Sequence, residues 1–373
     1  MAGIYFHIPF CKQACIYCNF HFKAGKHDSM PMTKAMAKEL RLRKRDFPHE
    51  KINTIYFGGG TPSLLQSNQI GELLQSVFEN FEVSPLAEIT LEANPDDLNP
   101  RKLKELKQLG INRLSIGIQT FNEDALKWMN RAHTPDQAIN CVREAQQQGI
   151  ENISVDLISG IPNLPTGYIR KDIEKALALS PKHLSCYSLT LEPGTSWERL
   201  IKLKNYAKPQ EEQQASEFEE TMKILAEKGW LHYEISNFAL SEEWVSKHNS
   251  AYWQQEAYIG IGPSAHSFYN QTRSWNLNNH SHYLQALADG EQPPAEQEKI
   301  DNTTAFNEAI MTGFRTLYGV SINTLRSIHP NFTEKFLIQA QTDHRIELLS
   351  DRIKIKQNHF LFADGIASDY FVV

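Results

Sequence analysis

Short apolar runs alternate with amphipathic, helix-like segments through the first half of this 373-residue chain. Six of the runs have the length and composition of strands, at residues 4–8, 52–57, 88–92, 113–118, 152–158 and 183–191. Nearly continuous apolar strands separated by helices are typical of parallel strands with helices on the outside. The pattern predicts an α/β fold, a partial (β/α)6 TIM-like barrel. An open doubly wound sheet is the alternative, because spacing alone does not show closure.

Helix boundary signals support this alternation. Asn99 and Thr134 each precede a proline, which favours a helix that starts there with the first residue as its cap. Gly110 and Gly149 follow these helices, where glycine favours an end. In either arrangement of parallel strands, functional side chains are expected at the carboxyl ends of the strands.

The pattern changes after about residue 200. Residues 208–229 have the pattern of a charged amphipathic helix, and residues 230–290 are rich in Tyr, Trp, Asn and His with weak periodicity. The last segment predicts helices followed by two short strands, an α/β region that resembles a winged helix. We therefore expect three parts: a barrel over 1–200, an extension over 201–295 and a winged-helix-like domain over 296–373.

Bulk composition excludes some functions. The net charge of −6 argues against nucleic-acid binding, which needs a basic surplus. No run of about 18 apolar residues is present, so no membrane span is expected. The first residues show neither a basic segment nor a cleavage site of a signal peptide, which favours a cytoplasmic location. In a reducing compartment, closely spaced cysteines indicate metal binding more than a disulfide.

Three of the five cysteines fall within eight residues, in HIPFCKQACIYCNF directly after the first predicted strand. A tetrahedral zinc site would need four nitrogen or sulfur ligands, and no fourth cysteine is near. Iron–sulfur clusters take thiolate ligands, and a cube contains four irons. The spacing therefore predicts that Cys11, Cys15 and Cys18 hold a four-iron cluster with one iron open. Cys141 and Cys186 lie in a helix pattern and a strand pattern, and are expected to be core thiols.

Polar residues and glycines gather where the later strands end. GGGTP, with Gly58, Gly59, Gly60 and Thr61, follows the second strand, and three glycines allow backbone to approach a ligand. Four polar side chains follow at or near successive strand ends: Glu92, Gln119, Arg131 and Asp156. Each would cost a few kcal/mol if buried without a partner. A partner from neighbouring backbone is the alternative for any one of them, but is a poor explanation for all four.

The cysteine spacing and its place after the first strand resemble the radical S-adenosylmethionine superfamily. The resemblance implies a [4Fe-4S] cluster whose open iron is chelated by the methionine part of S-adenosylmethionine. It also implies electron transfer that breaks the S–C5′ bond and gives a 5′-deoxyadenosyl radical. The glycine stretch would bind the methionine amine, and Glu92 the ribose hydroxyls. The cofactor-binding residues it implies are Tyr5, Tyr17, Gly59, Gly60, Thr61, Glu92, Gln119, Arg131 and Asp156.

Within that superfamily, the chain is most similar to the branch of the oxygen-independent coproporphyrinogen III oxidases and the HemW haem chaperones. The oxidases carry a further cysteine two positions after the third, where this chain has Phe20. KHNSAYW resembles the HNxxYW motif of the chaperone family, with His248, Tyr252 and Trp253. The resemblance implies haem as a third cofactor, with His248 as its iron ligand. A structural histidine with satisfied hydrogen bonds, at the surface or in the core, is the alternative, and His7 and His266 are weaker candidates.

These features predict a haem chaperone that hands haem to an acceptor protein of unknown identity. The alternative is an enzyme, a coproporphyrinogen III oxidase that decarboxylates by a radical route, and whether the chain is an enzyme stays open. No catalytic residue is assigned. An electron donor such as flavodoxin or ferredoxin is a further expected partner. A third hypothesis is that the chain is an interaction module that binds zinc.

Overall fold

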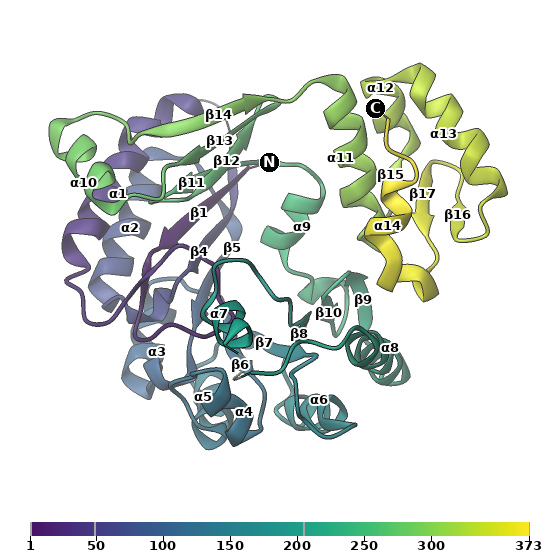
Figure 1. Ribbon diagram of the computed structural model, residues 1–373. Helices are drawn as coiled ribbons and strands as arrows, with labels where there is room; N and C mark the ends of the chain where they lie inside the picture. The colour runs from purple at the N-terminus through teal and green to yellow at the C-terminus, as the bar shows by residue number, and fades with distance from the viewer. Residues whose placement is uncertain (1, 48–49, 204–205, 373) are drawn as a thin grey trace.

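The computed structural model describes residues 2–47, 50–203 and 206–372. Its main sheet has twelve strands in the order β14-β13-β12-β11-β1-β4-β5-β6-β7-β8-β10-β9 (Figure 1). The six central strands are mutually parallel. They are β1 (Ala2–Ile8), β4 (Ile52–Gly59), β5 (Val83–Ala93), β6 (Arg113–Gln119), β7 (Asn152–Ser159) and β8 (His183–Ser188). All six predicted strands, and the α/β fold, are confirmed.

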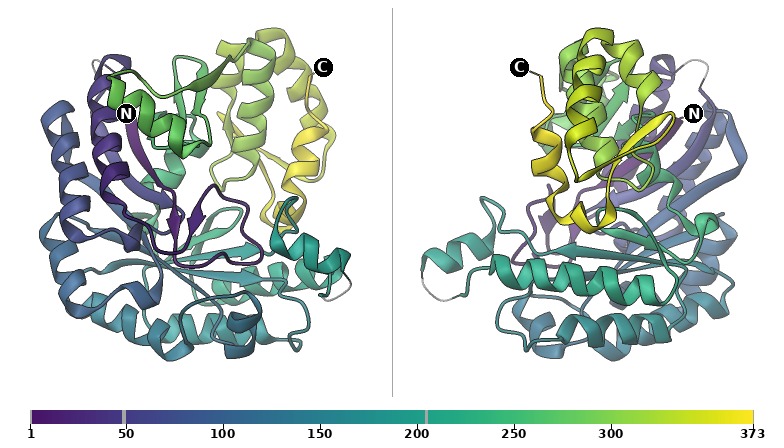
Figure 2. Two further views of the ribbon diagram at one scale, coloured as in Figure 1. Left: turned by 60° about the vertical axis from the view of Figure 1, so that its left-hand side comes forward. Right: turned by 90° about the vertical axis from the view of Figure 1, so that its right-hand side faces the viewer.

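Helices connect these strands and cover the outer face of the curved sheet (Figures 1 and 2). They are α1 (Met30–Leu42), α2 (Ser67–Asn80), α3 (Pro100–Gln108), α4 (Glu123–Trp128), α5 (Pro135–Gln147) and α6 (Tyr168–Ala178). The predicted caps are present: Asn99 accepts from the backbone N–H of Lys102, and Thr134 from that of Gln137. The apolar faces of these helices pack against the strands. Most side chains of the strands are almost fully buried, and Leu91 is one example.

The region with weak periodicity extends the sheet at both ends. On one side, β11 (Ala257–Ile261) pairs in parallel with β1, and β12 (His266–Tyr269), β13 (Thr272–Asn276) and β14 (Ala295–Lys299) continue in antiparallel order. On the other side, β10 (Asn237–Ala239) pairs with β8, and β9 (Leu231–Glu234) ends the sheet. Because the two ends of the sheet do not pair in the described chain, the barrel is partial.

Four helices accompany this extension. They are α7 (Ser196–Lys202), α8 (Glu211–Glu227), α9 (Lys247–Trp253) and α10 (His280–Asp289). The charged helix predicted over 208–229 is α8. The segment KHNSAYW is α9, which lies against β1 and β4. In the described parts of the chain, no helix combines the length and the apolar character that crossing a membrane requires.

The C-terminal segment has a hydrophobic core of its own, which includes Phe306, Phe314, Phe336, Ile353 and Phe360. Its elements run α11 (Asn302–Phe314), β15 (Val320–Ser321), α12 (Ile322–Ile328), α13 (Pro330–Thr342), β16 (Ile346–Leu348), β17 (Arg352–Ile355) and α14 (Ala363–Ser368). The order up to β17, with its three-stranded sheet, is that of a winged helix. The domain boundaries at residues 200 and 295 stay predictions.

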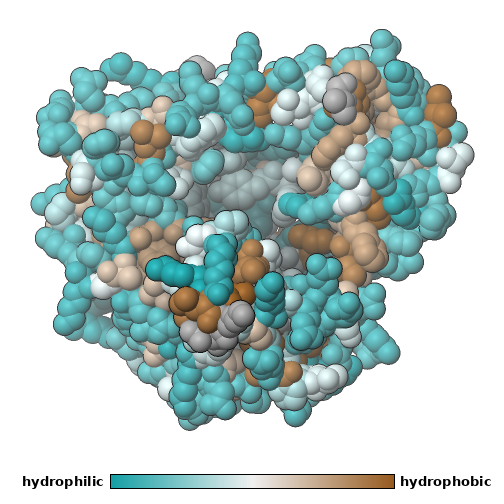
Figure 3. All heavy atoms as spheres, viewed as in Figure 1, coloured by the Kyte–Doolittle hydropathy of each residue, from teal (hydrophilic) through white to brown (hydrophobic). Residues whose placement is uncertain are grey.

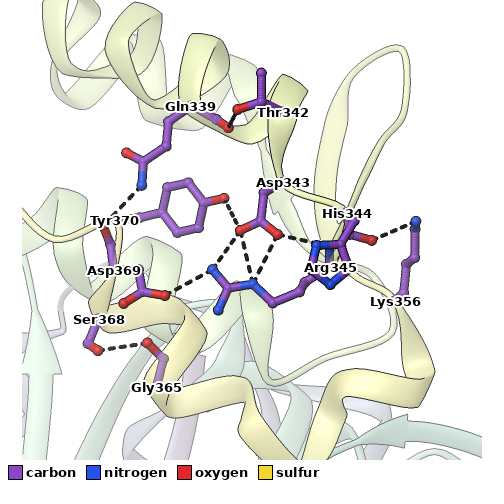
Figure 4. Close-up of polar contacts among 10 residues, drawn as sticks. All are labelled: Gln339, Thr342, Asp343, His344, Arg345, Lys356, Gly365, Ser368, Asp369 and Tyr370. Atoms are coloured by element: carbon purple, nitrogen blue, oxygen red, sulfur yellow. Dashed lines mark hydrogen bonds and ion pairs between the residues drawn. The ribbon is translucent and has the colours of Figure 1, made fainter.

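An ion-pair network fastens the end of this C-terminal unit (Figure 4). The Arg345 guanidinium donates to both carboxylate oxygens of Asp343, at 2.9 and 2.7 Å, and reaches Asp369 at 2.9 Å. The Tyr370 hydroxyl also donates to Asp343, at 2.8 Å. Since Asp343 follows α13 while Asp369 and Tyr370 follow α14, the network ties these two helix ends together. Arg345 holds the pKa of Asp343 well below its ordinary value.

We expect Asp343→Asn to lower the free energy of unfolding by about 1–3 kcal/mol at pH 7, because it removes a charge-assisted pair and leaves Arg345 weakly partnered. A carboxylate with a lowered pKa stabilises the fold above its ordinary pKa and loses that contribution as the pH falls, so the difference should shrink toward pH 3. Urea denaturation at several pH values measures it. Asp351→Asn, at an exposed carboxylate, is the control; equal stability of the two variants at pH 7 would contradict the assignment.

Candidate functional site

The three clustered cysteines lie on the loop that follows β1. Cys11, Cys15 and Cys18 are half-buried free thiols, and all three line a cleft of about 510 Å³. The same cleft is lined by residues at the carboxyl ends of β4, β5, β6 and β7. The sequence-based expectation that the chemistry gathers at this end of the barrel therefore agrees with the geometry.

Hydrogen-bond donors surround the three sulfurs. The Thr61 hydroxyl lies 3.4 Å from Cys11 Sγ, and the Arg131 guanidinium lies 3.4 Å from Cys15 Sγ. At Cys18, burial raises the pKa of the thiol and a hydrogen bond from the backbone of Phe20 partly offsets this rise. Donors of this kind stabilise thiolate sulfur, and hydrogen bonds to sulfur also set the potential of an iron–sulfur cluster. The donor set thus fits a thiolate-bound cluster.

Burial disfavours ionisation of two of these thiols, Cys11 and Cys18. Burial raises the pKa of Cys11 and of Cys18 to about 11, so iron would have to displace protons on binding. Within the described residues, no three His, Cys, Asp or Glu side chains converge on a point that could hold one metal ion. A four-iron cube does not need convergence, because each thiolate binds a different iron. The geometry therefore favours a cluster over a tetrahedral zinc ion, which needs four converging ligands.

The glycine stretch leaves no space for side chains. A Cβ atom at Gly58 would lie 3.0 Å from Glu92 Oε1, and one at Gly59, whose φ is +103°, would lie 2.7 Å from His7 Nδ1. At Gly60 it would lie 2.6 Å from the backbone oxygen of Phe10. Only glycine lets the end of β4 approach the cysteine loop so closely. The His7 ring fills the space above Gly59, and His7 itself lines a neighbouring cavity and not this cleft.

Two carboxylates lie at the strand ends. Glu92 accepts from the Tyr56 hydroxyl at 2.8 Å, and burial raises the pKa of Glu92 to about 7. Asp156 accepts from the Ser115 and Ser154 hydroxyls, each at 2.8 Å. Both carboxylates line the cleft. Both carboxylates thus have protein donors: Glu92 a tyrosine hydroxyl and the backbone of Gly59, and Asp156 two serine hydroxyls.

Arg131 and Gln119 complete the wall. The Arg131 guanidinium also donates to Asn94 Oδ1 at 2.6 Å and to the backbone oxygen of Gly117 at 2.7 Å. Its Nε is buried with no hydrogen-bond partner in the described chain, so this cation has an unused donor. Gln119 ends β6 in the left-handed region, with φ of 69°, at an irregularity in the pairing with β7. Such strain in a residue other than glycine is typical of functional sites.

The residues expected to bind the cofactor do not all line the same cavity. Tyr17 lines the cleft with the cysteines, but Tyr5 lines a neighbouring cavity instead. Asn94 and Tyr56 line the cleft and were not predicted. Asn94 could have been found, because it lies two residues after Glu92 and just past the same strand. Tyr56 is one of several buried aromatics in its strand, and nothing in the sequence distinguishes it. Cys141 and Cys186 are buried, as expected of core thiols.

His248 is buried inside the barrel and does not line the cleft. Its side chain is 2% exposed, and both ring nitrogens are engaged, Nδ1 with Thr54 at 2.8 Å and Nε2 with Tyr252 at 2.9 Å. The ring also stacks on Tyr56, with centroids 4.7 Å apart. An iron ligand needs a free nitrogen lone pair and access to the metal. This geometry corresponds to the alternative, a buried structural histidine, and does not support His248 as the haem ligand.

We expect Gly60→Ala to lower the free energy of unfolding of the cofactor-free chain by about 1–3 kcal/mol, because the new methyl group meets backbone that cannot rotate away. Chemical denaturation followed by circular dichroism measures it. Gly365→Ala is the matched control, since a Cβ at this helical glycine meets nothing within 4 Å. A Gly60→Ala variant as stable as Gly365→Ala would show that the close approach is not required.

The burial of His248 predicts that the free energy of unfolding depends on pH. Burial, and then Arg113, lower the pKa of His248 to about 3, against an ordinary value of about 6.5. Between these values the unfolded chain binds one more proton at this residue, so stability falls as the pH falls. The free energy of unfolding, plotted against pH, should therefore have a slope that is smaller in His248→Gln than in the wild type. We expect a difference of about 1.4 kcal/mol per pH unit between about pH 6 and 4. The exposed His282→Gln should leave the slope unchanged; equal slopes in both variants would refute the burial argument.

The chain is similar in sequence to known proteins of one superfamily. Residues 5–176 match the Radical SAM superfamily. "Heme chaperone HemW" of Lactococcus lactis subsp. lactis is 37% identical over 318 residues, 85% of this chain and 82% of that protein. "Heme chaperone HemW" of Bacillus subtilis is 36% identical over 327 residues, 86% of this chain and 85% of that protein.

The coproporphyrinogen III oxidase HemN from Escherichia coli, a solved structure, superposes with a TM-score of 0.83. The superposition covers 99% of this chain and 89% of that one at 20% identity, which shows a shared fold alone. The identity and coverage of the two HemW relatives go further. The chain belongs to the HemW family of radical SAM proteins.

Proposed function

We propose that the protein is a haem chaperone: it binds haem, a [4Fe-4S] cluster and S-adenosylmethionine, and passes haem to an acceptor protein. The observation that carries the proposal is the cleft in which three thiols meet the glycine stretch, in a chain whose relatives are named haem chaperones. Cys11, Cys15 and Cys18 would hold the cluster. When bound, cluster and S-adenosylmethionine together supply one-electron chemistry at the S–C5′ bond.

The residues of the cleft have separate tasks in this proposal. Thr61 donates to the sulfur of Cys11, and Arg131 donates to the sulfur of Cys15, so these two side chains would position the cysteine ligands of the cluster. The backbone of Gly59 and Gly60 offers N–H and C=O groups to the methionine end of the cofactor. Its ribose hydroxyls are placed by the carboxylate of Glu92. The other contacts proposed for S-adenosylmethionine come from Tyr17, Gln119, Arg131 and Asp156. A soluble electron donor such as flavodoxin or ferredoxin, and a cytoplasmic location, belong to the same proposal.

Phe20 favours the chaperone over an oxidase. It occupies the position at which the oxidases have a further cysteine, and its side chain is 65% exposed at the edge of the cleft. The second candidate, oxidative decarboxylation of coproporphyrinogen III, is favoured by one observation, the fold shared with a coproporphyrinogen III oxidase over nearly the whole chain. A phenyl ring there cannot act as a thiol ligand or hydrogen donor, so the chemistry of the two proteins differs next to the cluster.

Anaerobic reconstitution tests the cluster. The wild-type chain should take up four irons and four acid-labile sulfides, and S-adenosylmethionine should change the electron paramagnetic resonance spectrum of the reduced cluster, because one iron is open. Cys15→Ala should lose most of the iron, whereas Cys141→Ala, at a buried core thiol, should retain it. Zinc without sulfide in the wild type would end the cluster assignment.

Haem titration tests the function. The reconstituted chain should give a saturable Soret change with haem, and should release that haem to apomyoglobin as a probe acceptor. With coproporphyrinogen III, S-adenosylmethionine and a reductant, it should form no protoporphyrinogen, while a coproporphyrinogen III oxidase run alongside does. Robust protoporphyrinogen formation would favour the enzyme, and the absence of a saturable Soret change would refute the chaperone.

A further inference from the structure

A second cavity, of about 660 Å³, lies beside the cluster cleft. Its walls come from β1, α9, β11, β12 and α11, so it is bounded by the edge of the barrel and by the C-terminal unit. In the orientation of Figure 1, the surface is hollowed between these two parts (Figure 3). The volume lies within the range of small-molecule and cofactor sites, about 300–1,000 Å³.

The lining of this cavity is rich in aromatic residues. It includes Tyr5, Tyr252, Trp253, Tyr258 and Phe268, which come from four different elements. The rings of Tyr252 and Tyr258 meet edge to face, with centroids 4.6 Å apart, and Tyr258 lies 6.5 Å from the Phe268 ring in a tilted arrangement. Aromatic walls provide large flat apolar contacts with polar tips, which suits a flat conjugated ligand with a polar rim. The charged residues of the cavity, Arg273 and Glu308, already pair with each other at 2.8 Å.

One imidazole in the cavity is free to act as a ligand. His266 is exposed and lines the cavity, and its ring nitrogens make no hydrogen bond within the described chain. Its ring stacks on Trp275 across the β12–β13 pair, with centroids 5.8 Å apart. Desolvation and the nearby Arg273 lower the pKa of His266, which favours the neutral form of the ring. A neutral, unbonded imidazole is the form that binds haem iron.

The other histidines near the cavity lack one of these properties. His7 Nε2 is bound to the backbone oxygen of His21 at 2.8 Å, and its Nδ1 lies 3.3 Å from the Tyr5 hydroxyl. His21 lines the cavity and has an unpartnered Nε2, but this atom is buried, and the His280 ring lies against the imidazole with centroids 4.9 Å apart. His248, as shown above, has both nitrogens engaged.

We propose that this aromatic cavity is the haem site and that His266 supplies the ligand to the haem iron. The proposal rests on the proposed function and assigns the place and the ligand of the haem. Asn19 and Phe20 line both this cavity and the cluster cleft, so the haem would lie next to the cluster. The short segment of Asn19 and Phe20, directly after Cys18, would then contact both the cluster site and the haem site.

The test compares haem with metal-free protoporphyrin IX on the full-length chain, because only haem can gain from an iron ligand. His266→Ala should weaken haem binding by at least about tenfold and change the Soret maximum, and added imidazole should restore the spectrum. Its affinity for the metal-free porphyrin should stay that of the wild type. A His266→Ala chain that was merely misfolded would lose both ligands and would not respond to imidazole.

The controls separate this proposal from the proposed function. His282→Ala, at an exposed histidine on α10 outside the cavity, and His21→Ala should both bind haem like the wild type. If His266→Ala binds haem with unchanged affinity and spectrum while the wild type binds saturably, the assignment of His266 is overturned and the chaperone function stands. If the wild type itself fails to bind haem, the proposed function is refuted and the site with it.

Discussion

The close approach of two backbone segments supports the whole site. The N–H of Gly60, just after β4, donates to the backbone oxygen of Ile8, at the end of β1, with 2.8 Å between the heavy atoms. This contact joins the glycine stretch to the start of the cysteine loop, and places the Thr61 hydroxyl 3.4 Å from Cys11 Sγ. A side chain at Gly60 would meet two backbone oxygens. The cluster loop can therefore sit on the barrel only because this position is a glycine.

The interior of the barrel is divided along its axis into two layers with different chemistry. At the carboxyl ends of the strands, the Arg131 guanidinium donates to the sulfur of Cys15, in a cleft that also contains the carboxylates of Glu92 and Asp156. Deeper in the barrel, the Glu88 carboxylate accepts the backbone N–H groups of Lys247 and His248, both at 3.1 Å. That carboxylate anchors the start of α9, and the His248 ring follows into the core. The motif around His248 thus fixes α9 as one wall of the aromatic cavity.

Local sequence patterns predict the part of the fold that local forces determine. The six parallel strands follow from apolar runs, the caps at Asn99 and Thr134 from side-chain bonds three residues away, and the cysteine cleft from the rule that strand ends share one edge. The parallel pairing of β11 with β1 joins residues about 255 positions apart and leaves no local signal. The burial of His248 has the same cause, because its partner Thr54 lies on β4, 194 residues away. The resemblance to the family motif indicated His248 as the haem ligand. The accessibility of the imidazole, which only the tertiary structure shows, favours His266 instead.

The central claim is spatial: haem lies in the aromatic cavity, next to a cluster held by the three cysteines. An anaerobic crystal structure of the full chain, reconstituted with iron and sulfide and loaded with haem, tests it most directly. The account predicts the porphyrin against Tyr258 and Phe268 with a His266 nitrogen on the iron, and the cluster on Cys11, Cys15 and Cys18 across the segment of Asn19 and Phe20. Haem bound by His248, or haem inside the cluster cleft, would contradict it.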